Sequence, residues 1–261
     1  NALKERFSQV EILFVGAQNR IEMEKVPAAG YEIIGLPVIG FERKLSIKSI
    51  IFFFKLMQSL LQANKIVKQF QPDIAIGVGG FASGPVLYYA NRRKIPTVLQ
   101  EQNSFAGVTN KILGKKASRI CVAYENMEKY FPANKIVLTG NPIRKDLFLS
   151  KDKIDEAYKF FNLNNQQRIL LIIGGSLGAR TINHSVKNYI MQIAQSDVQV
   201  IWQTGKYYID DANRLVKECR ATNIHVHQFI NRMDFAYAVS DLVISRAGAG
   251  TISELSALGK P

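Results

Sequence analysis

The stretch DLVISRAGAGTISEL, residues 241–255, decides the fold class, because it joins the two patterns that alternate along the chain. A short apolar run typical of a buried strand breaks at a glycine-rich turn and continues into a helix-like segment. Repeated alternation of this kind predicts βα units on a parallel sheet. We expect strands near residues 10–15, 31–34, 73–78, 97–101, 118–123, 135–139, 168–173, 198–203, 224–229 and 241–245.

The strands fall into two series, which predict two domains. Polar residues dilute the pattern over 141–167, so we expect an N-terminal domain over 1–145 and a C-terminal domain over 146–261. A chain of 261 residues with 47% hydrophobic residues can bury substantial cores. Ligands of open α/β sheets bind at the carboxyl ends of the strands, here in a cleft between the domains.

The chain is strongly basic, with 34 Lys and Arg against 21 Asp and Glu and a net charge of +13. This excess predicts anionic partners: nucleic acid, an anionic membrane surface or phosphorylated substrates. Two widely spaced cysteines indicate a reducing compartment, with the cytoplasm as the default. The chain starts at Asn1 without a signal-peptide pattern and soon enters a strand, so we expect the first βα unit of the natural protein to be missing.

Three strand ends carry glycines, in GVGGFASGP (77–85), GGSLGAR (174–180) and RAGAGTISE (246–254). Glycines let a ligand approach the backbone, and the helix start that follows attracts phosphate. We expect the first of these helices to begin near Pro85. Tight structural turns explain any single glycine run equally well, but three turns in two similar domains favour phosphate binding. The patterns of P-loops and of dinucleotide sites are absent.

Glu254 follows the third glycine turn and has two interpretations. In a T-x-x-E capping box its carboxylate would return to the backbone N–H of Thr251. Alternatively, an acidic side chain near a helix start could accept both hydroxyls of a ribose. The pattern supports both interpretations equally.

Two further strand ends carry polar side chains. The loop QEQNSFAG, residues 100–107, offers Glu101 and Asn103 either to sugar hydroxyls or as a cap for a helix that begins near Val108. The segment TGNPIR ends at Arg144, whose forked donors suit phosphate, although a lone arginine in a linker is usually solvated.

The histidines do not indicate a metal site. His225 and His227 alternate in a strand and so face one side of the sheet, but no third ligand lies nearby in the sequence. We favour structural roles for both and expect no metal and no cofactor.

Residues 41–70 predict a helix that is apolar nearly all round. At about 100° per residue, one face of the helix carries Ile47, Ile50, Ile51, Phe54, Met57 and Leu61. The apolar surface extends round the helix through Phe52, Phe53, Leu56 and Leu60. The remaining narrow polar stripe consists of Lys48, Lys55, Ser59 and Gln62. The run is too short and too interrupted to span a bilayer. Deep burial is one explanation, but the nearby basic residues favour contact with anionic lipid headgroups. These are Arg43, Lys44, Lys48, Lys55, Arg92, Arg93 and Lys94.

Five motifs follow one another along the chain: GVGGFASGP (77–85), EQN-x-x-AG (101–107), TGNPIR (139–144), GGSLGAR (174–180) and RAGAGTISE (246–254). In this order and spacing they resemble the MurG family of peripheral membrane glycosyltransferases. The resemblance covers nearly the whole chain. It implies a glycosyltransferase-B fold, with two Rossmann-like parallel-sheet domains facing a cleft. It also implies inverting transfer of N-acetylglucosamine from UDP-N-acetylglucosamine to the C4 hydroxyl of undecaprenyl-diphospho-muramoyl-pentapeptide, for peptidoglycan synthesis at the cytoplasmic face of the inner membrane.

The resemblance implies site residues as well. The C-terminal domain would hold the UDP-sugar, with Ser176 at the diphosphate, Glu254 at the ribose, and Phe229 and Ile230 at the uracil. The full set of implied donor contacts is Asn103, Arg144, Ser176, Phe229, Ile230, Ala249, Gly250, Thr251, Ile252, Ser253 and Glu254. In the N-terminal domain, Gly79, Gly80, Phe81 and Ser83 would face the lipid acceptor.

The same resemblance leaves the catalytic base unassigned. The family's candidate, a histidine that ends a glycine-rich loop, would precede Asn1, and a glutamine-bearing segment would follow Pro261. Glu101 and Asn103 would support catalysis, and Gln100 stands where many relatives have histidine. We therefore expect an internal fragment that keeps much of the UDP pocket and has little or no transferase activity alone.

Three alternatives remain open. Two are enzymes of similar fold: a related glycolipid glycosyltransferase and a UDP-sugar epimerase. The third is a basic nucleic-acid-binding protein, which only the charge excess supports, because no aromatic stacking face accompanies the basic residues. We expect UDP-N-acetylglucosamine, the lipid-linked muramoyl-pentapeptide and an anionic membrane surface as partners, and no nucleic acid.

Overall fold

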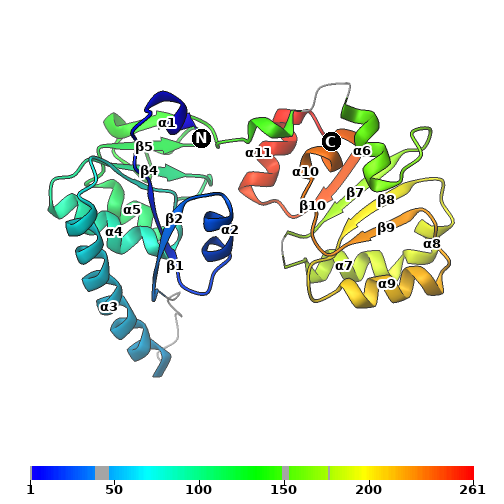
Figure 1. Cartoon of the computed structure of the whole chain (residues 1–261), viewed down its shortest axis with the longest axis horizontal. Coiled ribbons are helices and arrows are strands. Elements are labelled where there is room, and N and C mark those ends of the chain that lie inside the picture. Colours follow the sequence, from blue (N-terminus) through cyan, green and yellow to red (C-terminus); the bar gives the residue numbers. More distant parts are fainter. Residues whose placement is uncertain (1, 39–46, 149–152, 176) are drawn as a thin grey trace. The chain divides into compact units, whose positions relative to one another are not determined.

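The computed structural model of the chain describes residues 2–38, 47–148, 153–175 and 177–261. The chain divides into two compact units, unit 1 (Asn1–Gly140) and unit 2 (Asn141–Pro261), which we describe one at a time (Figure 1). Each of the ten expected strands is present close to its predicted position, and the strands within each sheet are parallel. The predicted α/β fold class with two parallel-sheet domains is confirmed.

Unit 1 contains one parallel sheet of two strands, β1-β2, and another of four strands in the order β3-β4-β5-β6. Its elements are α1 (Ala2–Arg6), β1 (Leu13–Ala17), α2 (Glu22–Ala28), β2 (Glu32–Leu36), α3 (Ile47–Phe70), β3 (Ala75–Gly77), α4 (Gly80–Arg92), β4 (Thr97–Glu101), α5 (Val108–Gly114), β5 (Arg119–Val122), η1 (Ala133–Lys135) and β6 (Ile136–Leu138).

The four-stranded sheet of unit 1 buries one face against α4 and α5. Leu99 of β4 and Ile120 of β5 are fully buried and pack with Leu87 of α4 and Leu113 of α5. Because side chains alternate along a strand, Glu101 at the end of β4 lies on the same face as Leu99. The fold therefore carries this carboxylate into the protein interior, where it needs hydrogen-bond donors.

Helix α3 packs by its polar stripe and exposes its apolar face. Ser59 is fully buried, with its hydroxyl donating to the Lys55 carbonyl at 2.7 Å, and the Gln62 amide donates to the Gly35 carbonyl at 3.3 Å. The exposed fractions of the apolar face are 45% for Ile51, 73% for Phe54, 58% for Met57 and 65% for Leu61. Deep burial of α3 is therefore wrong for the part of the helix that the structure describes.

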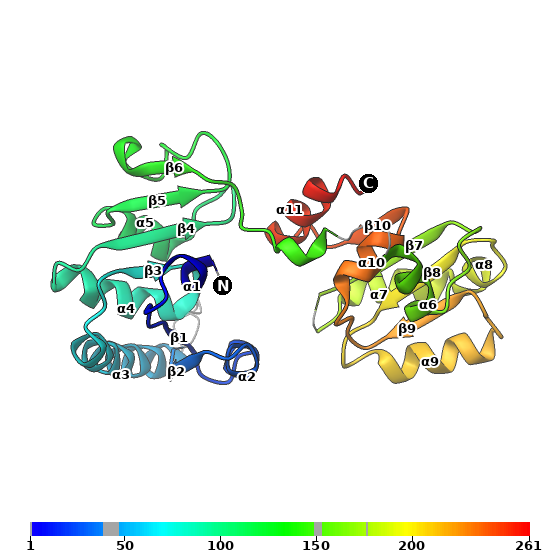
Figure 2. The same cartoon turned by 45° about the horizontal axis from the view of Figure 1, so that its top comes forward.

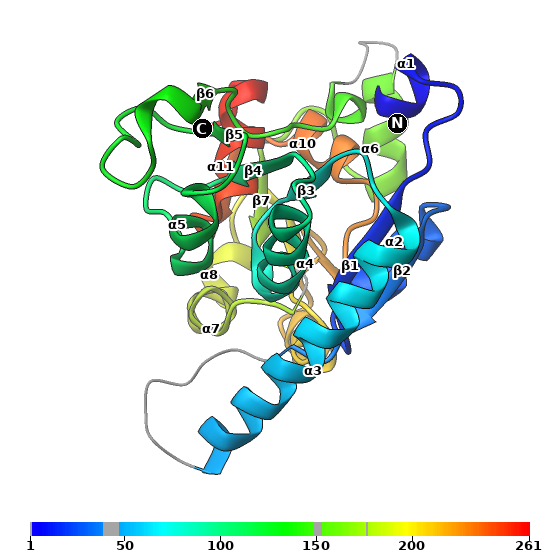
Figure 3. The same cartoon turned by 90° about the vertical axis from the view of Figure 1, so that its left-hand side faces the viewer.

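Small residues explain this orientation of α3. Ser59 and Ala63 are both fully buried, and their short side chains let the helix lie close to its neighbours, with which Ile66 also packs. Figures 1 and 3 show α3 beside α4, with the N-terminal end of α3 projecting beyond the rest of unit 1. Arg43 and Lys44, and the side chains of Ile47, Lys48 and Ile50, lie outside the described residues.

Unit 2 contains a four-stranded parallel sheet in the order β10-β7-β8-β9. Its elements are η2 (Lys145–Leu147), α6 (Ile154–Phe161), β7 (Ile169–Ile173), α7 (Arg180–Asn188), α8 (Ile190–Ala194), β8 (Gln199–Gln203), α9 (Ile209–Glu218), β9 (Ile224–His227), α10 (Met233–Val239), β10 (Leu242–Ser245) and α11 (Ala249–Leu258).

Both faces of the unit 2 sheet are covered by helices (Figure 2). The central strand β7 is the continuous apolar run ILLII, as expected for a parallel strand buried on both sides. One face packs on α6 and α10 through Phe161 and Phe235, and the other packs on α7, α8 and α9 around Trp202. The register aligns Ile173 with Gln203 and with Ser245, so the carboxyl ends of β7, β8 and β10 lie level.

Candidate functional site

The glycine turn after β7 is held by backbone contacts that only glycine permits. Gly175 and Gly178 have φ values of +84° and +82°. A Cβ on Gly178 would overlap the Thr204 carbonyl, and one on Gly205 would overlap the Gly178 nitrogen, so the turns after β7 and β8 touch through their main chains. A Cβ on Gly175 would meet open space. The backbone at Gly175 is therefore open to a ligand.

Gln203, at the end of β8, ties this glycine turn to the segment after β9. Its side chain is buried, its amide donates to the Gly175 carbonyl at 3.0 Å, and its carbonyl accepts from the Ile230 N–H at 2.9 Å. Both polar ends of the side chain are thus paired, which fixes the spacing between the two segments.

A pocket of about 460 Å³ opens at these strand ends, within the volume range of small-molecule sites. Its wall combines apolar side chains, glycine residues, and polar or charged side chains that include two arginines. The lining residues are Arg144, Ile173, Gly174, Gly175, Gln203, Phe229, Ile230, Met233, Tyr237, Ser245, Arg246, Gly248, Thr251 and Glu254.

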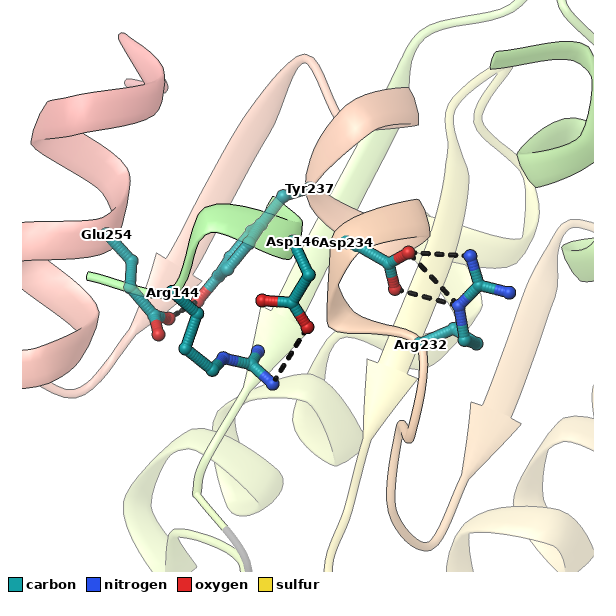
Figure 4. Close-up of polar contacts among 6 residues, drawn as sticks. All are labelled: Arg144, Asp146, Arg232, Asp234, Tyr237 and Glu254. Carbon is teal, nitrogen blue, oxygen red and sulfur yellow. Dashed lines mark hydrogen bonds and ion pairs between the residues drawn. The ribbon is translucent and has the colours of Figure 1, made fainter. Parts of the chain in front are cut away.

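Figure 4 shows three polar contacts in this part of unit 2, two of which involve residues that line the pocket. The Tyr237 hydroxyl donates to Oε2 of Glu254 at 3.0 Å. Arg144 lies 3.8 Å from Asp146, but both side chains are more than half exposed, so water screens this pair and its stabilising effect is small. Arg232, in contrast, holds Asp234 through contacts of 2.6–3.1 Å and lowers the pKa of that carboxyl.

The capping-box interpretation of Glu254 is wrong. Helix α11 begins at Ala249, with Gly248 as its N-cap, and no side chain caps its start. The helix starts this early because Gly248 already has the extended backbone that an N-cap needs, with φ −76° and ψ 141°. Thr251 lies inside the first turn, and the Glu254 carboxylate reaches Tyr237 instead.

Five of the residues that the resemblance implied for the donor lie together in this pocket: Arg144, Phe229, Ile230, Thr251 and Glu254. Ala249, Gly250, Ile252 and Ser253 belong to α11 but do not line it; the Ser253 hydroxyl donates to the Ala249 carbonyl and accepts from Asn141. Ser176 lies outside the described residues, and Asn103 belongs to unit 1.

The pocket residues that were not among the implied donor contacts include Gln203, Tyr237 and Arg246. Gln203 ends a strand, and Arg246 opens a glycine motif, so the rule that ligands bind at the carboxyl ends of strands could have found both. Tyr237 lies inside an apolar helical pattern, which says nothing about the partner of its hydroxyl.

In unit 1, Glu101 organises the loop after β4. Its buried carboxylate accepts hydrogen bonds from the Asn103 N–H at 3.1 Å, the Asn103 amide at 3.3 Å, the Gly107 N–H at 3.1 Å and the Asn110 amide at 2.9 Å. The N-cap of α5 is Gly107, and no side chain caps this helix in the usual way. Glu101 thus fixes the position of Asn103.

The helix that follows the glycine turn after β3 begins earlier than the sequence predicts. Helix α4 begins at Gly80 rather than near Pro85, because Gly79 and Gly80 turn the chain with φ values of +92° and +77°. The Ser83 hydroxyl donates to the Gly79 carbonyl at 2.5 Å, and Phe81 is 50% exposed. The turn and Phe81 are therefore open to solvent.

His225 and His227 lie on β9, and burial lowers the pKa of both imidazoles. The ring of His227 packs edge-on against Phe161, with 5.4 Å between ring centroids. Neutral, packed rings agree with the structural roles that the sequence favours. Within the described residues, no cluster of three or more His, Cys, Asp or Glu side chains has the arrangement of a metal site.

Models of two protein families match the chain. The glycosyltransferase family 28 N-terminal domain matches residues 1–122, and the glycosyltransferase family 28 C-terminal domain matches residues 169–261. Among solved structures, MurG of Acinetobacter baumannii is 26% identical, with a TM-score of 0.68 over 99% of this chain and 70% of that one. A UDP-GlcNAc 2-epimerase of Neisseria meningitidis bound to UDP-GlcNAc shares the fold at 15% identity, with a TM-score of 0.62 over 96% of this chain and 73% of that one.

A protein of Parabacteroides distasonis is more similar. It carries the name UDP-N-acetylglucosamine–N-acetylmuramyl-(pentapeptide) pyrophosphoryl-undecaprenol N-acetylglucosamine transferase, and it is 56% identical over 261 residues, which are 100% of this chain and 71% of the relative. An identity of this size along the entire sequence, with both domain models in the same order, leaves no doubt about the relationship. The chain belongs to the MurG family of N-acetylglucosamine transferases, within glycosyltransferase family 28.

Proposed function

We propose that the enzyme that contains this chain transfers N-acetylglucosamine from UDP-N-acetylglucosamine to the lipid-linked N-acetylmuramyl-pentapeptide, and that the unit 2 pocket holds the UDP of the donor. The activity is that of the 56% identical relative. The observation that carries the pocket assignment is that Arg144, Phe229 and Glu254, which lie far apart in the sequence, line one pocket of about 460 Å³.

The pocket offers chemically suitable groups to each part of UDP. Phe229 and Ile230 offer an apolar surface for the flat uracil ring, and the Glu254 carboxylate can accept hydrogen bonds from ribose hydroxyls. The diphosphate carries negative charge, which suits the Arg144 and Arg246 guanidinium groups and the open backbone at Gly175.

These groups also suit the chemistry of transfer. The acceptor C4 hydroxyl attacks the anomeric carbon from the side opposite UDP, its proton passes to a base, and the bond to the diphosphate oxygen breaks with its electron pair on UDP. Negative charge therefore grows on the leaving group. Fixed positive groups around the diphosphate stabilise the transition state more than the ground state, which accelerates the reaction.

Calorimetric titration of UDP into the chain tests the pocket. We expect Glu254→Ala to weaken UDP binding at least about tenfold, because a charged group that accepts hydrogen bonds from the ligand is lost. Glu218→Ala, on α9 away from the pocket, is the matched control. Urea unfolding of the same variants separates binding from folding: equal losses of affinity and stability in Glu254→Ala would contradict a direct role.

The two enzyme alternatives are separated by their products. Three UDP-N-acetylglucosamine 2-epimerase structures that share the fold are 12–15% identical, a level that supports only the fold. We expect radiolabelled UDP-N-acetylglucosamine to deliver its sugar to the lipid-linked muramoyl-pentapeptide in the presence of the enzyme that contains this chain. A labelled UDP-sugar epimer without any labelled lipid would instead support an epimerase.

We also propose that the exposed face of α3 rests on an anionic membrane surface, at the cytoplasmic side, where the lipid acceptor is reached. Apolar side chains that are 45–73% exposed, among them Phe54 and Leu61, favour insertion between headgroups. Lys65 and Lys68 on the same helix add attraction to anionic lipid. Among the helices that the structure describes, none has both the length and the apolar character to cross a bilayer.

A further inference from the structure

We infer that Tyr237 is a positioning residue for nucleotide binding, because its hydroxyl holds the Glu254 carboxylate in place for the ribose. This inference rests on the proposed function of the unit 2 pocket. The phenol touches Glu254 directly, at 3.0 Å from Oε2, but only 1% of the Tyr237 surface is exposed. The tyrosine therefore acts through the glutamate rather than through contact of its own with much of the ligand.

The phenol is a rigid support. Helix α10 buries Phe235, Ala236 and Tyr237 in the core between the sheet and α6, together with Leu171 and Ile201 of the two central strands. Side chains in such cores sit in single rotamers. The hydroxyl group therefore projects from a fixed point toward α11.

The carboxylate that it holds is, in contrast, only partly buried and is carried by a flexible side chain. Glu254 lies on α11, and Oε2 accepts the Tyr237 hydrogen bond. Within the described part of the chain, Oε1 of Glu254 accepts no hydrogen bond from another residue. Tyr237 thus fixes the rotamer through one oxygen and leaves the other available to a ligand hydroxyl, which reduces the entropy that binding would otherwise cost.

The charges around the phenol favour its role as a donor. Burial raises the pKa of Tyr237, the negative charge of Glu254 raises it further, and Arg144 lowers it by a smaller amount. The hydroxyl group therefore keeps its proton at neutral pH. A neutral phenol holds the carboxylate without cancelling its charge, whereas a lysine or arginine there would form an ion pair that competes with the ligand.

The test compares UDP with 2′,3′-dideoxy-UDP, which lacks both ribose hydroxyls, by calorimetry on the wild-type chain and on Tyr237→Phe. We expect wild type to prefer UDP, and Tyr237→Phe to bind UDP about tenfold more weakly while its affinity for the dideoxy nucleotide stays nearly unchanged. Tyr158→Phe, a phenol in the same unit that does not line the pocket, is the matched control and should change neither affinity.

A double-mutant cycle completes the test. In a Glu254→Ala background, Tyr237→Phe should have no further effect on UDP affinity. An equal loss for both nucleotides in Tyr237→Phe, or a further loss in the Glu254→Ala background, would overturn the positioning role while leaving the pocket assignment intact. A wild-type chain that binds UDP and the dideoxy nucleotide equally well would overturn the ribose role of Glu254, and the inference with it.

Discussion

Gly178 and Gly205 touch through their backbones, so neither position has room for a side chain. The contact joins the turn after β7 to the turn after β8, and both turns border the pocket through Gly175 and Gln203. The shape of the proposed phosphate-binding turn therefore depends on a residue in another loop.

Gly205→Ala should destabilise unit 2 by more than about 3 kcal/mol, because it adds an overlap with the Gly178 backbone to the strain of a positive φ. Gly175→Ala is the matched control: its φ of +84° is similar, but its Cβ would meet open space. We expect Gly175→Ala to lower the free energy of unfolding by only about 1–2 kcal/mol, which is the cost of backbone strain alone. Urea unfolding measures both, and equal costs would show that the backbone contact has no energetic weight.

Asn183→Ala should destabilise unit 2 by about 1–3 kcal/mol, because it leaves two buried groups without partners. The Asn183 amide donates to the Thr204 carbonyl at 2.8 Å, and its carbonyl accepts from the indole N–H of Trp202 at 3.1 Å. Trp202 is the single tryptophan of the chain, so its fluorescence reports this site alone. Unchanged emission and unchanged stability would contradict the role of this network.

Gln203→Leu should weaken UDP binding about tenfold, because the glycine turn and the segment at Ile230 lose their shared hydrogen bonds. Gln199→Leu is the matched control. It lies at the other end of β8, is also buried, and makes two hydrogen bonds to the backbone of Asn164. Both variants should lose similar stability, but only Gln203→Leu should lose affinity. Parallel losses of affinity would show that general loosening of β8 is responsible.

Asp241→Asn should remove part of the acid sensitivity of unit 2. Hydrogen bonds from the Ile169 N–H and the Arg168 guanidinium lower the pKa of Asp241 in the folded state. The stabilisation is therefore fully present above the usual aspartate pKa of about 3.9 and is lost as the pH falls through the lower folded-state value. The difference in free energy of unfolding between wild type and variant, measured by urea unfolding at several pH values, should shrink over this window. A difference that stays constant with pH would contradict the role of Asp241.

Phe54→Ser should reduce binding to anionic vesicles at least about tenfold, because insertion of a phenylalanine contributes about 1.5–3 kcal/mol. Phe105→Ser is the control, since Phe105 is 69% exposed in the same unit but lies outside α3. Sedimentation at low and high salt measures binding, and added salt should weaken it for both proteins. Equal binding by wild type and Phe54→Ser would argue against the α3 surface.

The strands could be predicted from the sequence because their signal is local: runs such as ILLII specify a buried parallel strand wherever they occur. The first residues of the helices were harder to predict from the sequence than the strands. The chain patterns favoured Pro85 and Thr251, but the backbone conformations of Gly79 and Gly248 set the starts at Gly80 and Ala249.

Orientation and side-chain pairing depend on contacts between distant segments, so the sequence did not reveal them. A helical wheel separates the two faces of α3, but only the fit of Ser59 and Ala63 inside unit 1 decides that the polar stripe faces inward. The motifs TGNPIR and RAGAGTISE suggested that Arg144 and Glu254 belong to one site. The hydrogen bond from Tyr237 to Glu254, in contrast, depends on how α10 and α11 pack, which the sequence does not reveal.

Two residues that line the pocket lie near opposite ends of the unit 2 sequence, since Arg144 precedes η2 and Glu254 lies on α11. A nucleotide that contacts both side chains would hold these two segments together. Saturating nucleotide will therefore slow proteolytic cleavage before η2 as well as around α11, although the two places lie more than a hundred residues apart along the chain.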